Sequence, residues 1–183
     1  MNNQFLNSLK ILNESDINDP VRDFLVKMNK IHYGWLDEDH KLHYGIDDTE
    51  EFFEKYVLQS PTQCWANKIG VCWDQVEVER DFFHEQDIEY KSIYIAMDNE
   101  DEASHTFMLF KTDSWYWFEH SWYKWAGIYD VESVNKGIVE VVRQMKKQYP
   151  KDKVKEIYEY KRPKFGISVV EFIGHIREGK KLK

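Results

Sequence analysis

Apolar residues at helical spacing predict helices in both halves of the chain. Asp19 and Pro20 are typical of an N-cap and a first helical position, and the apolar residues after them predict the first helix. Capping boxes at 48–51 and 168–171 predict two further helix starts. The spacing of Val and Ile over 132–149 predicts a long helix near the C-terminal end.

Between these helices the apolar period changes from helical to alternating. Alternation over 90–97, 104–110, 114–119 and 154–161 predicts four strands. The aromatic stretch 122–130 has neither period and is expected to be an irregular loop. Helices and closely spaced strands in one chain of 183 residues predict an α+β fold. We expect a single domain over residues 1–183, with its core at about 50–130.

One cysteine is predicted to lie at the start of a helix. The stretch Ile-Gly-Val-Cys-Trp-Asp at 69–74 closes a loop and opens a helical pattern that runs to about Phe83. The free N–H groups of a first turn favour a thiolate at Cys72, but a helix terminus supplies only ~0.3–2 kcal/mol. Lowering the pKa of an ordinary thiol by ~3 units takes ~4 kcal/mol. A nucleophilic cysteine here therefore needs a basic partner from elsewhere in the chain.

A predicted β-hairpin offers that partner. If the turn 111–113 joins Phe110 to Ser114, His105 lies directly opposite Glu119 on the same face. A carboxylate in that position can hold one imidazole nitrogen and leave the other free for a nucleophile. A shift of one residue in the pairing would place the two side chains on opposite faces.

Three segments together resemble the transglutaminase-like superfamily of papain-type cysteine enzymes. The first is Gly-Val-Cys-Trp-Asp at 70–74, the second is the strand that carries His105, and the third is Trp-Tyr-Trp-Phe-Glu-His-Ser-Trp at 115–122. The resemblance covers about a third of the chain, residues 60–125. It departs from the family pattern at Glu119, where aspartate is usual, and at His120, where proline is usual.

The resemblance implies a fold and a mechanism. The fold is a cysteine-bearing helix packed against an antiparallel sheet, here with extra N- and C-terminal helices. Cys72 would be the nucleophile, His105 the general base and Glu119 the orienting acid, with no cofactor. The implied activity is acyl transfer from a peptide or carboxamide bond through a thioester, as in a protease, deamidase or amidase. An amine acceptor in place of water would give transglutamination.

Two departures from the family pattern motivate an alternative: a catalytically degenerate module that binds a peptide or partner protein in an aromatic groove. Trp73, Trp117 and Trp122 are the candidate groove walls. In the enzyme interpretation, Gln63 or Trp65 would join the Cys72 backbone N–H in an oxyanion hole.

Composition narrows the classes of partner. A net charge of −8 and a pI near 5.4 argue against a general nucleic-acid or anionic-membrane surface. We see no secretory signal and no apolar run of ~20 residues, and therefore expect a cytoplasmic protein with free thiols at Cys64 and Cys72. These cysteines and His84 lack the short paired spacing of zinc sites, so no metal is expected. A peptide or protein substrate is expected, and the oligomeric state is left open.

Overall fold

The computed structural model describes residues 19–98 and 103–183. The weak apolar pattern of the first dozen residues and most of the acidic stretch 98–102 lie outside these ranges. The described part has a mixed α+β fold, as predicted, with six α-helices, one 3₁₀ helix and eight strands. Its strand pairing is antiparallel in both sheets.

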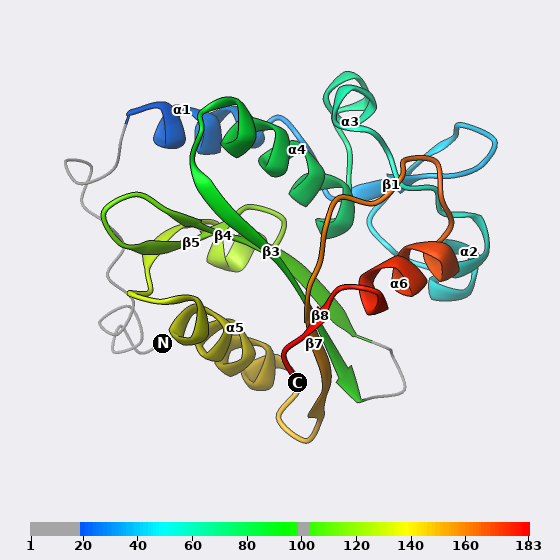
Figure 1. Cartoon of the computed structure of the whole chain (residues 1–183). Helices are drawn as coiled ribbons and strands as arrows, with labels where there is room; N and C mark the ends of the chain where they lie inside the picture. Colours follow the sequence, from blue (N-terminus) through cyan, green and yellow to red (C-terminus); the bar gives the residue numbers. More distant parts are fainter. Residues whose placement is uncertain (1–18, 99–102) are drawn as a thin grey trace.

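A six-stranded sheet forms the centre of the molecule (Figure 1). Its order is β6-β5-β4-β3-β7-β8, so the three strands that follow the cysteine helix are neighbours in chain order. A separate two-stranded sheet joins β1 and β2. The strands are β1 (Gly34–Leu36), β2 (Leu42–Tyr44), β3 (Glu89–Asp98), β4 (Ser104–Lys111), β5 (Trp115–Glu119), β6 (Gly127–Asp130), β7 (Lys153–Glu159) and β8 (Lys180–Lys181).

Helices cover both faces of this sheet (Figure 1). Alternate residues of the strands point to opposite faces. Met108 and Phe110 of β4 therefore join the core beneath α1 and α4, whereas Phe107 and Leu109 join the core beneath α5. Each such fully buried side chain contributes ~1.5–3 kcal/mol. The helices are α1 (Asp19–Met28), α2 (Thr49–Lys55), α3 (Pro61–Asn67), α4 (Cys72–Glu85), α5 (Val134–Gln148), α6 (Val169–Arg177) and the 3₁₀ helix η1 (Tyr123–Trp125).

The predicted helices and strands are present, with shifted ends. The prediction of an irregular loop at 122–130 is wrong in part, because this segment contains η1 and the short edge strand β6. Residues 62–68, whose sequence is compatible with an irregular loop or a helical turn, fall largely in α3. Such short elements contain too few residues to show a helical or alternating pattern of apolar residues. Their conformation is instead determined by packing against the rest of the fold.

The predicted register of the central hairpin is wrong by two residues. Lys111 pairs with Trp115, so the turn is 112–114 and not 111–113. Continuing the ladder beyond its last pair, Met108 with Phe118, places Glu119 level with Phe107 and one diagonal step from His105. A shift of two keeps every side chain on its face, whereas a shift of one would not. The predicted His105–Glu119 contact survives for this reason.

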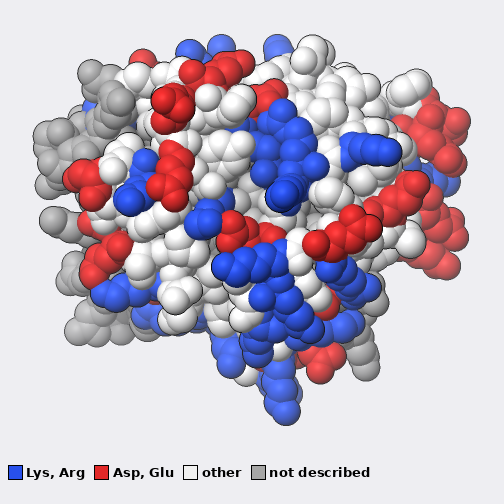
Figure 2. Space-filling view, in the orientation of Figure 1, with Lys and Arg blue, Asp and Glu red and all other residues white. Residues whose placement is uncertain are grey.

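Charge is unevenly spread over the face shown in Figure 2. Lys and Arg side chains gather over the segments around β7 and β8, and acidic side chains gather over α2. Part of the basic charge is neutralised locally, because Lys91 contacts Glu159 at 2.7 Å and Arg177 contacts Glu156 at 2.8 Å.

Candidate active site

The loop before α4 is held so that Cys72 occupies the first position of the helix. A Cβ atom on Gly70 would lie 2.8 Å from the Cys64 sulfur and 2.9 Å from the Asp74 Cβ. Only glycine allows this close approach of the backbone to the helix. The glycine two residues before Cys72 is therefore explained by packing.

Asp74 fixes the same loop through three hydrogen bonds. Its Oδ2 accepts from the Val71 N–H at 2.9 Å, and its Oδ1 accepts from the Tyr56 hydroxyl and the Gln59 N–H, each at 2.9 Å. Burial raises the pKa of Asp74 to about 7, although these hydrogen bonds act to lower it. The aspartate of the Gly-x-Cys-x-Asp stretch thus orders the segment that precedes the cysteine.

His105 and Glu119 form a buried ion pair. The His105 Nε2–H donates to Glu119 Oε2 at 2.7 Å, and the two residues are 7% and 2% exposed. The other carboxylate oxygen accepts from the Ser121 hydroxyl at 3.1 Å and from the Trp122 N–H at 2.9 Å. Both oxygens of the Glu119 carboxylate are therefore hydrogen-bonded. The extra methylene of glutamate relative to aspartate does not prevent the contact with His105.

The charge of His105 follows from its neighbours. Burial alone would lower its pKa, but the Glu119 carboxylate and hydrogen bonds with Cys72 and Glu119 outweigh burial and raise the pKa to about 10. Because Cys72 is among the groups that raise this pKa, its thiol lies close to the imidazole. Because Glu119 occupies Nε2, Nδ1 is the nitrogen available to the thiol. The three predicted residues converge at the start of α4 and the adjoining ends of β4 and β5.

A second buried histidine lies immediately after Glu119. The His120 Nδ1–H donates to Gln75 Oε1 at 2.6 Å, and Gln75 Nε2 donates to the Gly70 carbonyl at 2.8 Å. This chain of hydrogen bonds connects the end of β5 to the loop before Cys72. Burial lowers the pKa of His120 to about 4, so the ring is neutral, and its Nε2 has no partner among the described residues.

A buried carboxyl group lies two helical turns after Cys72. Glu79 is 2% exposed, and its Oε2 has no hydrogen-bond partner within the described residues. Burial raises the pKa of Glu79 well above its ordinary value, and the nearby Glu119 charge acts in the same direction. Glu79 therefore differs from Glu119, whose carboxylate is paired with His105.

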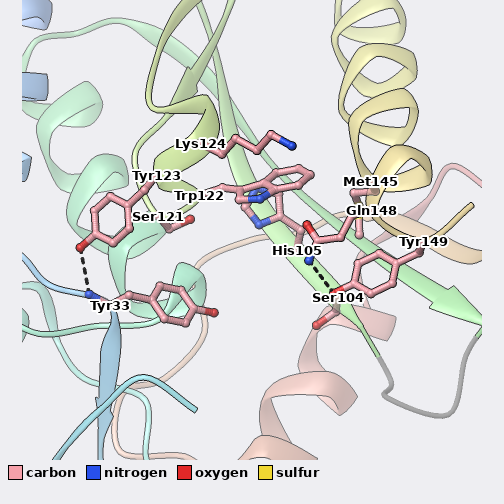
Figure 3. A pocket seen from close by; sticks show the side chains of 10 residues that line it. All are labelled: Tyr33, Ser104, His105, Ser121, Trp122, Tyr123, Lys124, Met145, Gln148 and Tyr149. Atoms are coloured by element: carbon pink, nitrogen blue, oxygen red, sulfur yellow. Dashed lines mark hydrogen bonds between the residues drawn. The ribbon is translucent and has the colours of Figure 1, made fainter. Parts of the chain in front are cut away.

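Two adjoining cavities flank the convergent residues. His105 lines one cavity of about 370 Å³, and Cys72 lines another of about 200 Å³. Both are bordered by Tyr33, Ser104 and Tyr149, so the cavities meet where the thiol and the imidazole lie. Figure 3 shows the larger one, with Tyr33 and Tyr123 on one side and Gln148 and Tyr149 on the other.

The predicted groove residues have different positions. Trp122 lines the larger cavity and Trp73 lines the smaller one. Trp117 is fully buried in the core beneath α5, where it contacts Tyr129, and it lines neither cavity. The alternation that put Trp117 on the face of Glu119 was correct, but α5 covers that face.

The structure does not bring the predicted oxyanion residues to the site. Gln63 caps its own helix, because its Oε1 accepts from the Ser60 N–H at 2.9 Å. Trp65 is half-buried against the core, and neither residue lines the two cavities. The Cys72 backbone N–H belongs to the first turn of α4 and remains the candidate donor.

Sequence reasoning missed Tyr33, Ser121 and Tyr149. Ser121 follows Glu119 by two residues, and this spacing could have suggested that its hydroxyl shares the carboxylate's face. Tyr33 and Tyr149 come from distant parts of the chain, before β1 and after α5, and no local pattern marks them. The Tyr33 N–H donates to the Tyr123 hydroxyl at 3.1 Å, which joins two walls of the cavity.

Over residues 19–98 and 103–183, no group of three or more His, Cys, Asp or Glu side chains is placed to hold a metal ion. In the same ranges no helix has the length and apolar character needed to cross a membrane.

Comparisons with known proteins give no match: no protein-family model, no curated protein and no solved structure is similar to this chain. The resemblance to the transglutaminase-like superfamily therefore stays a prediction, and function is argued from the site.

Proposed function

We propose that this protein is a cysteine-dependent acyl-transfer enzyme of transglutaminase-like fold that acts on a peptide or carboxamide bond. The observation that carries the proposal is the buried His105–Glu119 pair at 2.7 Å, beside the Cys72 thiol, which also acts on the pKa of the imidazole. An imidazolium with a raised pKa stabilises a neighbouring thiolate, which supplies the free energy that the helix terminus alone lacks. Glu119 fixes the ring orientation for this pairing.

The chemical steps follow from these positions. The Cys72 thiolate attacks the carbonyl carbon and forms a C–S bond, while the oxyanion faces the Cys72 backbone N–H. His105 gives its Nδ1 proton to the leaving nitrogen, and the C–N bond breaks to leave a thioester. His105 then takes a proton from water, whose oxygen attacks the thioester and releases the acid and the thiolate. An amine acceptor in place of water gives transamidation.

The degenerate binding module remains the competing interpretation. It is motivated by the departures at Glu119 and His120, and a carboxylate beyond ~4 Å from the imidazole would favour it. The observed distance of 2.7 Å removes that geometric argument. We therefore retain the enzyme as the proposed function.

Selective alkylation tests the proposal. Iodoacetamide at pH 6 should label Cys72 rapidly and Cys64 slowly, as read by peptide mass spectrometry. An ordinary thiol with pKa ~8.5 is only ~0.3% ionised at this pH, so loss of the ion pair should slow labelling by up to ~10²-fold. We expect this loss in His105→Ala.

His84→Ala is the matched control, because His84 is an exposed histidine at the far end of the same helix. It should label like the wild type. Cys64 is fully buried and reports unfolding, so its labelling should stay slow in every folded variant. Equal, slow labelling of both cysteines in the wild type would contradict the proposal.

A further inference from the structure

Resting on the proposed function, we propose that the substrate is an N-acyl amino acid or short acyl-peptide: a small apolar acyl group joined by an amide to a residue with a free carboxylate. Each of the two cavities lies on one side of the scissile bond, and the side chains that line each cavity indicate the group that fits there.

The positions of nucleophile and acid decide which side is which. Cys72 binds the acyl carbon, so the acyl group extends into the smaller cavity that Cys72 lines. His105 protonates the leaving nitrogen, so the leaving amine extends into the larger cavity that His105 lines. Tyr33, Ser104 and Tyr149 form the shared border, where the scissile amide would lie.

The acyl-side cavity is the smaller of the two. Aliphatic and aromatic side chains dominate its lining, and its volume is about 200 Å³. It has no Asp, Glu, Lys or Arg among its described lining residues. A charged acyl group would lose hydration there without a counter-charge, so an apolar group of a few carbons is the better fit. Its apolar walls are Ile46, Phe52, Phe53, Val71 and Trp73.

The leaving-group cavity is larger and carries positive charge. Aromatic rings from Tyr33, Trp122, Tyr123 and Tyr149 line its 370 Å³. Lys124 extends across its upper edge in Figure 3. No Asp or Glu is among its described lining residues, although the chain carries a net charge of −8. The rings can pack against an apolar or aromatic side chain.

Lys124 is available to bind an anion. Its Nζ lies 5.6 Å from the centroid of the Trp125 ring, and it has no ion-pair partner among the residues that the structure describes. The carboxylate of a leaving amino acid is the anion that the amide itself brings into this cavity. Hydrolysis would release that amino acid and the apolar acid.

The test compares matched substrates. N-butyryl-L-phenylalanine and its C-terminal amide differ only in the charge at the carboxyl group. Because an exposed ion pair contributes up to ~1 kcal/mol, kcat/KM should favour the free acid by up to about fivefold. In Lys124→Met this ratio should fall to about one.

Lys147→Met is the control. The Lys147 Nζ lies 5.5 Å from the same Trp125 ring centroid, but Lys147 does not line the cavity. This variant should keep the wild-type ratio of acid to amide. An equal loss on both substrates in Lys124→Met, with the ratio kept, would overturn the carboxylate assignment.

A second arm tests the acyl side. Phe53→Ala should enlarge the smaller cavity and raise the hexanoyl-to-butyryl ratio of kcat/KM. An unchanged ratio would overturn the assignment of this cavity to the acyl group. If Cys72 alkylates selectively but none of these amides is cleaved, the substrate class is wrong and the proposed function stands. If Cys72 is not selectively alkylated, the proposed function itself fails.

Discussion

Two buried histidines near the end of β5 have opposite charge preferences. The pKa of His105 is raised to about 10, whereas that of His120 is lowered to about 4. Both are less than a tenth exposed, and burial lowers the pKa of each. The difference lies in their partners, because His105 donates to the Glu119 carboxylate and His120 donates to the Gln75 amide.

Each partner suits a different task. A charged imidazole beside a thiol can stabilise a thiolate and later deliver a proton. A neutral imidazole can connect two backbone segments without adding charge to the core. The consecutive residues Glu119 and His120 at the end of β5 thus belong to two different groups: a charged pair beside the thiol, and a neutral hydrogen-bonded link to α4. Variants that change one group at a time should separate the reactivity of Cys72 from the stability of the fold.

The largest effect is expected for Glu119→Gln. This change removes the main cause that raises the pKa of His105, so burial should return that pKa below its ordinary value. The ion pair with Cys72 should be lost near neutral pH, and alkylation at pH 6 should slow by up to ~10²-fold. The measurement is the pH profile of the labelling rate, which should move to alkaline pH.

Gln75→Leu provides the contrast, because it acts on the neutral histidine, His120. It removes the amide bound by His120 and leaves the His105–Glu119 contact in place. We expect a lower free energy of unfolding with an alkylation profile close to that of the wild type. A profile that shifts equally in both variants would show that the two histidines do not have separate tasks.

The next effect is an acid-dependent loss of stability through His120. Its folded pKa of about 4 lies below the ordinary value near 6.5, so the unfolded chain binds more protons between these values. The stabilising contribution is complete above pH ~6.5 and is lost as pH falls towards 4, at up to ~1.4 kcal/mol per pH unit. Urea unfolding of the wild type and of His120→Gln across this window measures it.

The difference in the free energy of unfolding between the wild type and His120→Gln reports the contribution of His120 alone. Asp74 has a raised pKa of about 7 and titrates in the same window with the opposite sign, but it is present in both proteins. The wild type should therefore lose its advantage over His120→Gln as pH falls. A difference that stays constant from pH 7 to 4 would show that His120 is not held neutral by the fold.

The residues of the candidate site were predictable because local patterns mark them. A glycine, a helix start and a cysteine within a few residues indicated Cys72, and strand alternation put His105 and Glu119 on one face. The register was predicted wrongly, since a three-residue turn fits the sequence equally well one position later, yet the face depends only on odd or even spacing. The alternation of side chains along the strands therefore gives the correct face even when the register is wrong by two residues.

The surroundings of the site could not be predicted in the same way. Trp117 has the spacing of a groove residue, but whether α5 covers that face depends on tertiary packing. Gln63 has a suitable amide, but the side chain caps its own helix. Tyr33 and Tyr149 meet across the cleft although they are far apart in sequence. Such contacts carry no local period, so only the folded chain reveals them.

The smallest effect is expected for Ser121→Ala. The Ser121 hydroxyl donates to Glu119 Oε1 at 3.1 Å, and the Trp122 N–H donates to the same oxygen at 2.9 Å. One donor to the carboxylate remains, and the lost hydrogen bond costs about 0.5–1.5 kcal/mol. Alkylation at pH 6 should therefore slow only about two- to tenfold, with little change in the midpoint of its pH profile.

Ser114→Ala is the matched control at the other end of β5, where the hydroxyl donates to Asp130 Oδ1 at 3.0 Å. It should leave the labelling rate unchanged. If Ser121→Ala slows labelling as much as Glu119→Gln, the orientation of the carboxylate matters more than its charge. The contrast between His105 and His120 would then rest on hydrogen-bond geometry, and the serine after the strand would belong to the site as much as the glutamate that ends it.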